Sequence, residues 1–277
     1  MLNVNDHSRD SAGLIYVYPV VSRRAGGVSV GINLNINNAC NWACVYCQVP
    51  NLTRGGPPPI NLGTLGEELR AFLHAATQGD FLVQNAPTEA RRLVDVAFSG
   101  NGEPTSATEF AEAVALVEEI LREFSLLEQL KVRLITNGSL LHRPAVREGI
   151  ARIGAINGEV WFKVDRVTAQ GMAKINGMVI PTDKIQSALL QCASLAPTWV
   201  QTCYLAIDGE EADEAEQSAY LELIKSVQEK IKGVHLYGLA RPSLQPDAGR
   251  LTNLTSDRFC RFAQRISALG VEVVANP

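Results

Sequence analysis

The sequence lacks both a long apolar run and an excess of basic residues. No stretch approaches the roughly 18 consecutive apolar residues of a membrane span, and the start MLNVNDHSRDS lacks the basic-then-apolar layout of a secretory signal. We therefore expect a cytoplasmic protein with no membrane partner. The formal net charge is −4 at pH 7, whereas a protein that binds nucleic acid usually has an excess of basic residues. Nucleic acid is therefore not favoured as a partner.

Internal repeats, low-complexity tracts and linkers are absent as well. A chain of 277 residues with 46% hydrophobic residues is long enough for one large core. We therefore predict a single domain over residues 1–277, in which 1–27 form an N-terminal extension and 28–277 form the main fold.

Strand patterns and helix patterns alternate about six times along the chain, which favours parallel β/α units that close partly or wholly into a barrel. In such folds the chemistry lies at the carboxyl ends of the strands. The predicted strands are 14–21, 27–36, 93–99, 131–136, 158–165, 198–207, 234–240 and 271–275. The predicted helices are 65–78, 110–124, 143–154, 182–195, 221–231 and 256–269.

Two helix starts carry a capping-box pattern. Thr64 with Glu67 precedes the first predicted helix, and Ser106 with Glu109 precedes the second. We expect each pair to satisfy free backbone N–H groups at its helix start.

Half of the six cysteines lie in the stretch CNWACVYC, as Cys40, Cys44 and Cys47 with the spacing C-x3-C-x2-C. Three thiolates in one loop can bind three irons of a [4Fe-4S] cluster and leave the fourth iron without a protein ligand. A structural zinc site is an alternative, but it needs a fourth ligand from a remote His or Cys. Three packed core thiols are a further alternative.

Two Gly-containing stretches follow neighbouring predicted strands. In SGNGEPT, two glycines allow a backbone to pass close to a ligand, and Glu103 offers an acceptor for a ligand's ammonium. In ITNGS, Thr136 and Asn137 are placed to hydrogen-bond hydroxyl groups. Either stretch taken alone is more often a plain turn.

Together with the cysteines, these stretches resemble the radical S-adenosylmethionine superfamily. The matching features are C-x3-C-x2-C with an aromatic residue before the third cysteine, GNGEP after a barrel strand, and TNG at the next strand end. SRRAGGVSVGINL, CVYCQVP, GNGEPT and FKVD resemble, more narrowly, the iron–sulfur oxidoreductases related to wyosine-type transfer-RNA synthases. The resemblance covers most of the chain.

That resemblance implies a partial (β/α)6 TIM-like barrel with an N-terminal β-hairpin extension. It implies a [4Fe-4S] cluster on Cys40, Cys44 and Cys47, bound S-adenosylmethionine, and a one-electron donor such as flavodoxin or ferredoxin. The residues that it implies for the bound S-adenosylmethionine are Tyr46, Gly100, Asn101, Gly102, Glu103, Thr136 and Asn137.

Two later strands carry polar residues that point toward the same end. Lys163 and Asp165 alternate with apolar residues in VWFKVD, so we predict that they face inward; an ordinary buried ion pair is the alternative. In VHLYGLARP, His235, Tyr237 and Arg241 share a face, and Arg241 is able to grip a carboxylate or phosphate. We assign Lys163, Asp165 and Arg241 as candidate catalytic residues.

The predicted function is radical chemistry on a small-molecule or peptide substrate, with a 5′-deoxyadenosyl radical that abstracts hydrogen. Wyosine-type synthases carry further cluster cysteines, whereas this chain has no cysteine before Cys40. That departure, with the acidic balance, disfavours the alternative of a transfer-RNA-modifying enzyme. A zinc-stabilised binding module without turnover is the alternative from another class. Cys192 and Cys203 are expected in the core, and Cys260 lies on the final helix.

Overall fold

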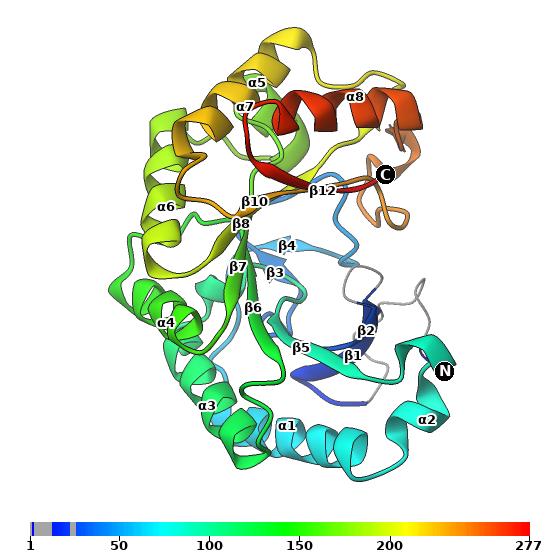
Figure 1. Ribbon diagram of the computed structural model, residues 1–277, viewed down its shortest axis with the longest axis vertical. Helices are drawn as coiled ribbons and strands as arrows, with labels where there is room; N and C mark the ends of the chain where they lie inside the picture. Colours follow the sequence, from blue (N-terminus) through cyan, green and yellow to red (C-terminus); the bar gives the residue numbers. More distant parts are fainter. Residues whose placement is uncertain (1, 3–12, 23–25) are drawn as a thin grey trace.

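One curved sheet forms the centre of the molecule (Figure 1). The computed structural model describes residues 2, 13–22 and 26–277. The large sheet has eight strands in the order β1-β2-β5-β6-β7-β8-β10-β12. Neighbours from β2 to β12 are parallel, whereas β1 is antiparallel to β2. The strands are β1 Val17–Ser22, β2 Gly27–Ile32, β5 Leu93–Phe98, β6 Lys131–Thr136, β7 Glu159–Lys163, β8 Thr198–Cys203, β10 Gly233–Tyr237 and β12 Glu272–Asn276.

Helices cover the outer side of this sheet, as Figure 1 shows. Each helix that links two parallel strands packs against the next, in the order α1, α3, α4, α6, α7 and α8. This order follows the strands, as expected for right-handed β/α units. The helices are α1 Leu62–Thr77, α2 Phe81–Asn85, α3 Phe110–Glu123, α4 Pro144–Ala155, α5 Ala169–Asn176, α6 Thr182–Leu195, α7 Glu214–Val227 and α8 Ser256–Ser267.

Alternation along each strand separates an apolar outer face from a polar inner face. Val30, Val132, Val160, Val200 and Val234 face the helices and are completely buried in the main core. This burial drives the sheet and helices together, because each fully buried side chain of this kind contributes about 1.5–3 kcal/mol.

A buried ion-pair network occupies the inner face near the amino ends of the strands. The Arg133 guanidinium pairs with Asp95, and its Nε donates to Glu159 Oε1 over 2.7 Å. Ser29 donates to Asp95, and Trp161 Nε1 donates to Glu159 over 3.0 Å. Burial raises the pKa of the Asp95 carboxyl, although Arg133 opposes the change. The interior is therefore polar but internally bonded at this end.

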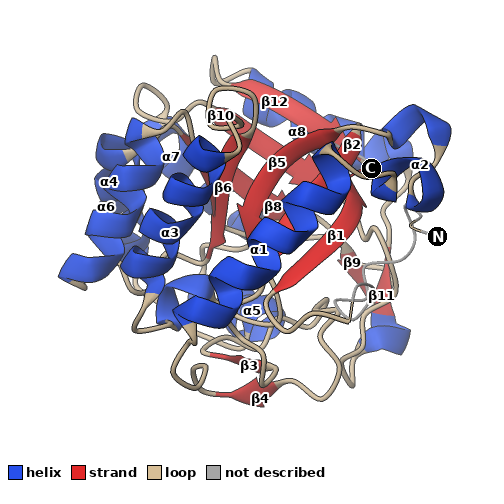
Figure 2. Ribbon diagram, turned by 90° about the horizontal axis from the view of Figure 1, so that it is seen from below, coloured by secondary structure: helices blue, strands red, loops and turns tan. Residues whose placement is uncertain are grey.

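Two short sheets and α5 gather at the other end of the barrel, on the lower side in Figure 2. One sheet pairs β3 (Ala39–Cys40) with β4 (Thr53–Arg54). The other pairs β9 (Ala206–Ile207) with β11 (Leu251–Thr252). This end, where the parallel strands finish, is where chemistry is expected in a β/α barrel.

The predicted partial barrel and its N-terminal hairpin are confirmed. Six β/α links join the parallel strands from β2 to β12, and the order ends at β1 and β12 without closing in the described part of the chain. The hairpin's second strand is also the first barrel strand, and residues 23–25 of its predicted turn lie outside the described residues. The single domain stays a prediction. None of the helices in the described ranges is long and apolar enough to cross a membrane.

Both predicted capping boxes are wrong. The first helix begins at Leu62, and its cap is Asn61, whose side chain accepts from Thr64 N over 3.1 Å. Ser106 lies instead in a 3-10 turn (Pro104–Ser106), and Glu109 caps α3 without a side-chain hydrogen bond. The turn intervenes because Glu103 organises the chain between β5 and α3.

Replacing Asn61 should therefore weaken α1, while replacing Thr64 should not. We expect Asn61→Ala to lower the free energy of unfolding by about 1 kcal/mol, because a free N–H loses its acceptor. Thr64→Ala should change it by less than about 0.5 kcal/mol. Urea unfolding followed by circular dichroism measures both, and equal losses would contradict the assignment of Asn61 as the cap.

Candidate functional site at the carboxyl end of the barrel

The three clustered cysteines line one cavity at this end. The cavity has a volume of about 290 Å³ and lies between the cysteine loop and the ends of β5, β6, β7, β8 and β10. Its walls include all three clustered cysteines and most of the predicted site residues: Cys40, Cys44, Cys47, Tyr46, Gly100, Gly102, Glu103, Asn137, Lys163 and Arg241. We call it the cluster cavity. The structure thus brings residues from five separate segments to one place.

The glycines of GNGEP are required by contact with the chain itself. A Cβ on Gly102 would lie 2.2 Å from the backbone oxygen of Ala39, and a Cβ on Gly100 would lie 2.4 Å from Asn33 Oδ1. Gly100 also has a φ of 151°, which other residues rarely adopt. Close packing against the segment that leads into Cys40 thus explains why both positions are glycine, whether or not a ligand also lies close to their backbone.

Glu103 joins the ends of β5 and β6. Its carboxylate is 3% exposed and accepts from Thr105 N and Oγ1 over 3.1 and 2.6 Å. It also accepts from Thr136 Oγ1 and from Asn137 N, each over 2.7 Å. Burial raises the pKa of the Glu103 carboxyl, and these hydrogen bonds oppose the change. Four protein donors thus already bind the Glu103 carboxylate. The predicted role of Glu103 as an acceptor for a ligand's ammonium stays a prediction.

Asparagines that the sequence reasoning missed connect the cysteine loop to these strand ends. Asn137 Nδ2 donates to Asn41 Oδ1 over 2.9 Å, and Asn41 Nδ2 donates to Ser139 Oγ over 2.7 Å. Asn33 Oδ1 accepts from Asn101 N over 3.0 Å. The run of asparagines in GINLNINNACN was a usable signal, because short amides commonly hydrogen-bond nearby backbone in loops.

Asp165 binds four other parts of the site. Its Oδ2 accepts from Tyr46 OH over 2.5 Å and from Asn176 Nδ2 over 2.7 Å. Its Oδ1 accepts from Cys203 N over 2.8 Å, and Lys163 Nζ lies 3.9 Å from Oδ2. Asp165 is 2% exposed, so these bonds act in a medium of low dielectric. Lys163 and Asp165 are therefore a pair, and Asp165 also holds the cysteine loop, but only Lys163 lines the cluster cavity.

Lys163 places a partly buried positive charge beside the cysteines. Its Nζ lies 4.9 Å from the centre of the Tyr46 ring and 3.3 Å from Tyr237 OH. Burial alone would lower the pKa of the Lys163 ammonium, but Asp165 and the other acidic groups around it together outweigh burial and raise the pKa above its ordinary value. Lys163 therefore stays protonated at neutral pH and can attract negative charge in the cavity.

Three thiols in one loop are a donor set that a [4Fe-4S] cluster can use. Among residues 2, 13–22 and 26–277, no three His, Cys, Asp or Glu side chains gather as the ligands of one ion do. Cysteines of a [4Fe-4S] cluster bind different irons and lie farther apart. Burial raises the pKa of Cys40 to about 11 and that of Cys44 to about 12, so the metal-free thiols are neutral, and metal binding must displace their protons.

Helix α5, which the sequence reasoning missed, braces the cysteine loop. Ala43 N donates to Asn176 O over 3.1 Å, and Val45 N donates to Ile175 O over 2.9 Å. Arg54 donates to Asn41 O and to Gly177 O, each over 2.5 Å. The eight residues of α5 follow β7 after the loop 164–168 and carry only a short apolar pattern, so the sequence offers a weak helix signal there.

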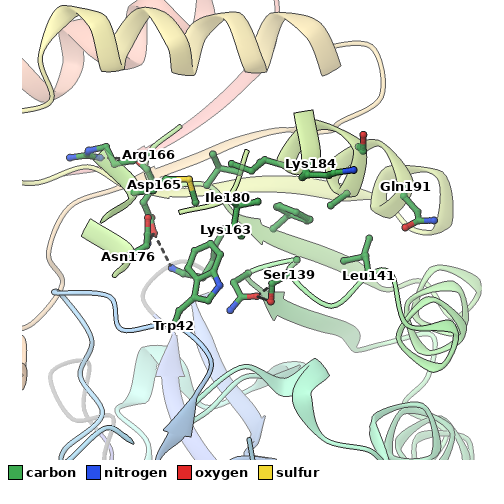
Figure 3. Close-up of a pocket in the computed structure, with 18 of the residues that line it drawn as sticks. Trp42, Ser139, Leu141, Lys163, Asp165, Arg166, Asn176, Ile180, Lys184 and Gln191 are labelled. Atoms are coloured by element: carbon green, nitrogen blue, oxygen red, sulfur yellow. Dashed lines mark hydrogen bonds and ion pairs between the residues drawn. The ribbon is translucent and has the colours of Figure 1, made fainter. Parts of the chain in front are cut away.

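Two further cavities adjoin the site. The barrel interior holds about 430 Å³ and shares Ser99, Tyr237 and Arg241 with the cluster cavity. We call it the lumen. A second space of about 430 Å³ lies between α6 and the loop after β6 (Figure 3). In this outer cavity, Asp165 and Asn176 lie at one end, and Lys184 and Gln191 lie near the other.

The remaining predicted residues lie in different surroundings. Tyr237 and Arg241 line both the cluster cavity and the lumen. His235 instead stacks on Trp199 at 4.4 Å between ring centroids and lines none of these cavities. Cys203 is buried as predicted, but it also lines the cluster cavity. Thr136 is fully buried beneath that cavity and binds Glu103.

The other two cysteines lie away from the cluster cavity. Cys192 is completely buried in the main core, as predicted, and Cys260 is exposed on α8. Neither lines the cluster cavity.

No family model matches the chain. Over 159 residues, 57% of this chain, it is 31% identical to a UPF0026 protein of Methanocaldococcus jannaschii, of which the match covers 42%. Over 132 residues, 48% of this chain, it is 26% identical to the GTPase Obg of Brachyspira hyodysenteriae, of which the match covers 17%. The chain thus spans less than half the length of these curated relatives. The sequence contains no G-x4-G-K-[ST] motif.

Solved structures share the fold across most of the chain. A mutant of spore photoproduct lyase matches with a TM-score of 0.57 and 9% identity, over 93% of this chain and 78% of that one. SuiB of Streptococcus suis, bound to S-adenosylmethionine, matches with 0.55 and 11%, over 91% and 47%. TYW1 with a bound lysine–pyruvate adduct matches with 0.53 and 13%, over 87% and 73%. The chain shares the fold of these three structures, and the partial barrel implied by the motifs is thereby confirmed.

Gly102 should tolerate no side chain. Gly102→Ala should lower the free energy of unfolding by about 1–3 kcal/mol, because the new Cβ meets a backbone oxygen that cannot move alone. Gly249→Ala is the matched control, because a Cβ there meets nothing within 4 Å. Urea unfolding of both variants measures the difference, and an unchanged Gly102→Ala protein would show that the two segments are not in contact.

Proposed function

We propose that the chain is a radical S-adenosylmethionine enzyme that holds a [4Fe-4S] cluster on Cys40, Cys44 and Cys47. The chemistry supplied there is one-electron cleavage of a carbon–sulfur bond of S-adenosylmethionine, which gives methionine and a 5′-deoxyadenosyl radical that removes a hydrogen atom from the substrate. The observation that carries the proposal is the cluster cavity, where three thiols, the partly buried ammonium of Lys163 and the ends of five strands meet.

The protein's part in this chemistry is to bind, orient and exclude water. The residues proposed to contact S-adenosylmethionine are Tyr46, Gly100–Glu103 and Asn137. Thr136 would act indirectly, because its hydroxyl donates to the Glu103 carboxylate. The carboxylate of Glu103 keeps the β5 and β6 loops in register, so its influence on the nucleotide is partly indirect. Lys163 is proposed to neutralise a carboxylate of the nucleotide or of the substrate, because it remains protonated.

The proposed substrate is a small molecule or a short peptide segment. The lumen of about 430 Å³ is in the range of small-molecule sites, and it adjoins the cluster cavity at Arg241. Arg241 is proposed to bind a carboxylate or phosphate of that substrate. The electron would come from a donor such as flavodoxin or ferredoxin. No described cavity favours transfer RNA over a small molecule.

Anaerobic turnover tests the proposal directly. The purified chain, reconstituted with iron and sulfide and reduced with dithionite, should convert S-adenosylmethionine to 5′-deoxyadenosine and methionine in equal amounts. Liquid chromatography measures both products. A reconstituted chain that carries a full cluster and forms neither product would overturn the proposal, as would a colourless chain that binds one zinc ion.

Cys44→Ser should abolish the cluster and the cleavage together, since it removes one of three iron ligands. Cys192→Ser places a hydroxyl in a fully buried apolar site and should affect stability only, by about 1–3 kcal/mol. Iron content and the brown absorbance of the cluster distinguish the two variants. Equal loss of iron from both would contradict the ligand assignment.

Glu103→Ala should weaken binding of S-adenosylmethionine and leave the cluster in place. The change frees Thr136 and Asn137 N, which shape the cavity, but it removes no thiol. Equilibrium dialysis with labelled nucleotide should show at least a tenfold loss of affinity, about 1.4 kcal/mol. Glu112→Ala, on the exposed side of α3, is the control. Loss of the brown colour from Glu103→Ala would mean that Glu103 supports the cluster instead.

A further inference from the structure

We infer that Asn176 is a positioning residue that sets the reduction potential of the cluster through a hydrogen bond to the Cys44 sulfur. The inference deepens the proposed function and rests on it. Asn176 is the last residue of α5 and is 1% exposed. Its Nδ2 lies 3.3 Å from Cys44 Sγ and 2.7 Å from Asp165 Oδ2.

The direction of this amide is determined by its two partners. A carboxamide nitrogen carries two protons, and the carboxylate of Asp165 can only accept. One proton therefore goes to Asp165, and the other points at the sulfur. Asp165 is in turn held by Tyr46 OH and Cys203 N, so the acceptor that orients Asn176 is itself fixed.

Backbone hydrogen bonds on both sides of Cys44 fix the distance between Asn176 Nδ2 and Cys44 Sγ. Asn176 O accepts from Ala43 N, the residue before Cys44, and Ile175 O accepts from Val45 N, the residue after it. A left-handed Gly177 with a φ of 62° ends the helix directly behind the amide. The cysteine and the asparagine therefore cannot separate without breaking this short ladder.

A hydrogen bond to a cluster thiolate favours the reduced state. Reduction adds one negative charge to the cluster and its sulfurs, and a donor stabilises that charge, more strongly in a buried site. Cys40 receives its donor from the backbone at Trp42 N over 3.4 Å, which no side-chain replacement removes. The donor to Cys44 is a side chain, so at this sulfur the amino-acid sequence can tune the potential.

A role in folding alone would leave a different signature. Loss of a structural contact lowers stability or cluster content, whereas loss of a tuning hydrogen bond moves the potential of a cluster that is still complete. The two are separated by measuring iron and sulfide per chain together with the midpoint potential, in the absence of S-adenosylmethionine.

The test uses two variants and one control in the reconstituted full chain. Asn176→Leu keeps the volume and removes the donor, and Asn176→Asp keeps the shape but replaces the donor by an acceptor. Ile175→Val is the control, because it keeps the backbone bond to Val45. Redox titration followed by electron paramagnetic resonance gives the midpoint of each.

We expect full iron and sulfide in all three. In Asn176→Leu, the ratio of reduced to oxidised cluster at a fixed potential should fall about tenfold. For a one-electron couple this change corresponds to a midpoint potential that is about 59 mV more negative. Asn176→Asp should shift at least as far, and Ile175→Val should match the native chain.

An unchanged midpoint in both Asn176 variants with complete clusters would overturn the inference and leave the proposed function intact. Loss of the cluster from both variants while their unfolding curves stay native would also overturn it, because Asn176 would then hold the loop rather than tune the potential. A native chain that takes up no iron and sulfide would overturn the proposed function itself.

Discussion

The carboxylate of Asp165 is the point at which the cysteine loop, two barrel strands and α5 are joined. It accepts from Tyr46 in the loop, from Cys203 at the end of β8 and from Asn176 at the end of α5, with Lys163 nearby. A buried carboxylate with several donors is stable only while those donors stay in place. These hydrogen bonds act together with a small apolar cluster, in which Val45 and Tyr46 of the loop pack against Ile175 of α5 and Cys203 of β8, to fix the relative positions of these elements.

The rest of the barrel places the Asp165 carboxylate at the carboxyl end of the strands. Outer faces of the strands bury valines and leucines against the helices, so the inner faces are free to carry Arg133, Lys163 and Tyr237. At the amino end, Asp95 and Glu159 neutralise Arg133 within the interior. Asp95 and Arg133 also line the lumen, and Lys163 and Tyr237 line the cluster cavity at the carboxyl end. Polar groups of the inner face thus line cavities at both ends of the sheet.

The order of strands and helices was predictable because period-2 and period-3.6 patterns are local properties of the sequence. The helix starts were not, since Asn61 and the turn after Glu103 are selected by contacts that the capping patterns do not contain. Helix α5 was missed for a related reason. At eight residues it depends on packing against the cysteine loop more than on its own propensity.

Within the candidate site, motif spacing identified the cysteines, the Gly-Glu loop and the inward pair at 163 and 165, because each lies in a short segment with its own pattern. It did not identify Asn41 or Asn176 as partners, since these residues contact sites 96 and 132 positions away in the chain. It also assigned Glu103 a ligand role without showing that four protein donors surround its carboxylate.

By itself, the sequence determined the order of the eight strands of the large sheet and of the six helices that link its parallel strands, and it determined which thiols lie together in one loop, because these depend on neighbours along the chain. Only the tertiary structure decided which polar groups meet across the barrel mouth. That choice depends on how far each strand extends and where each loop returns, and those are set by the packing of the whole sheet against its helices.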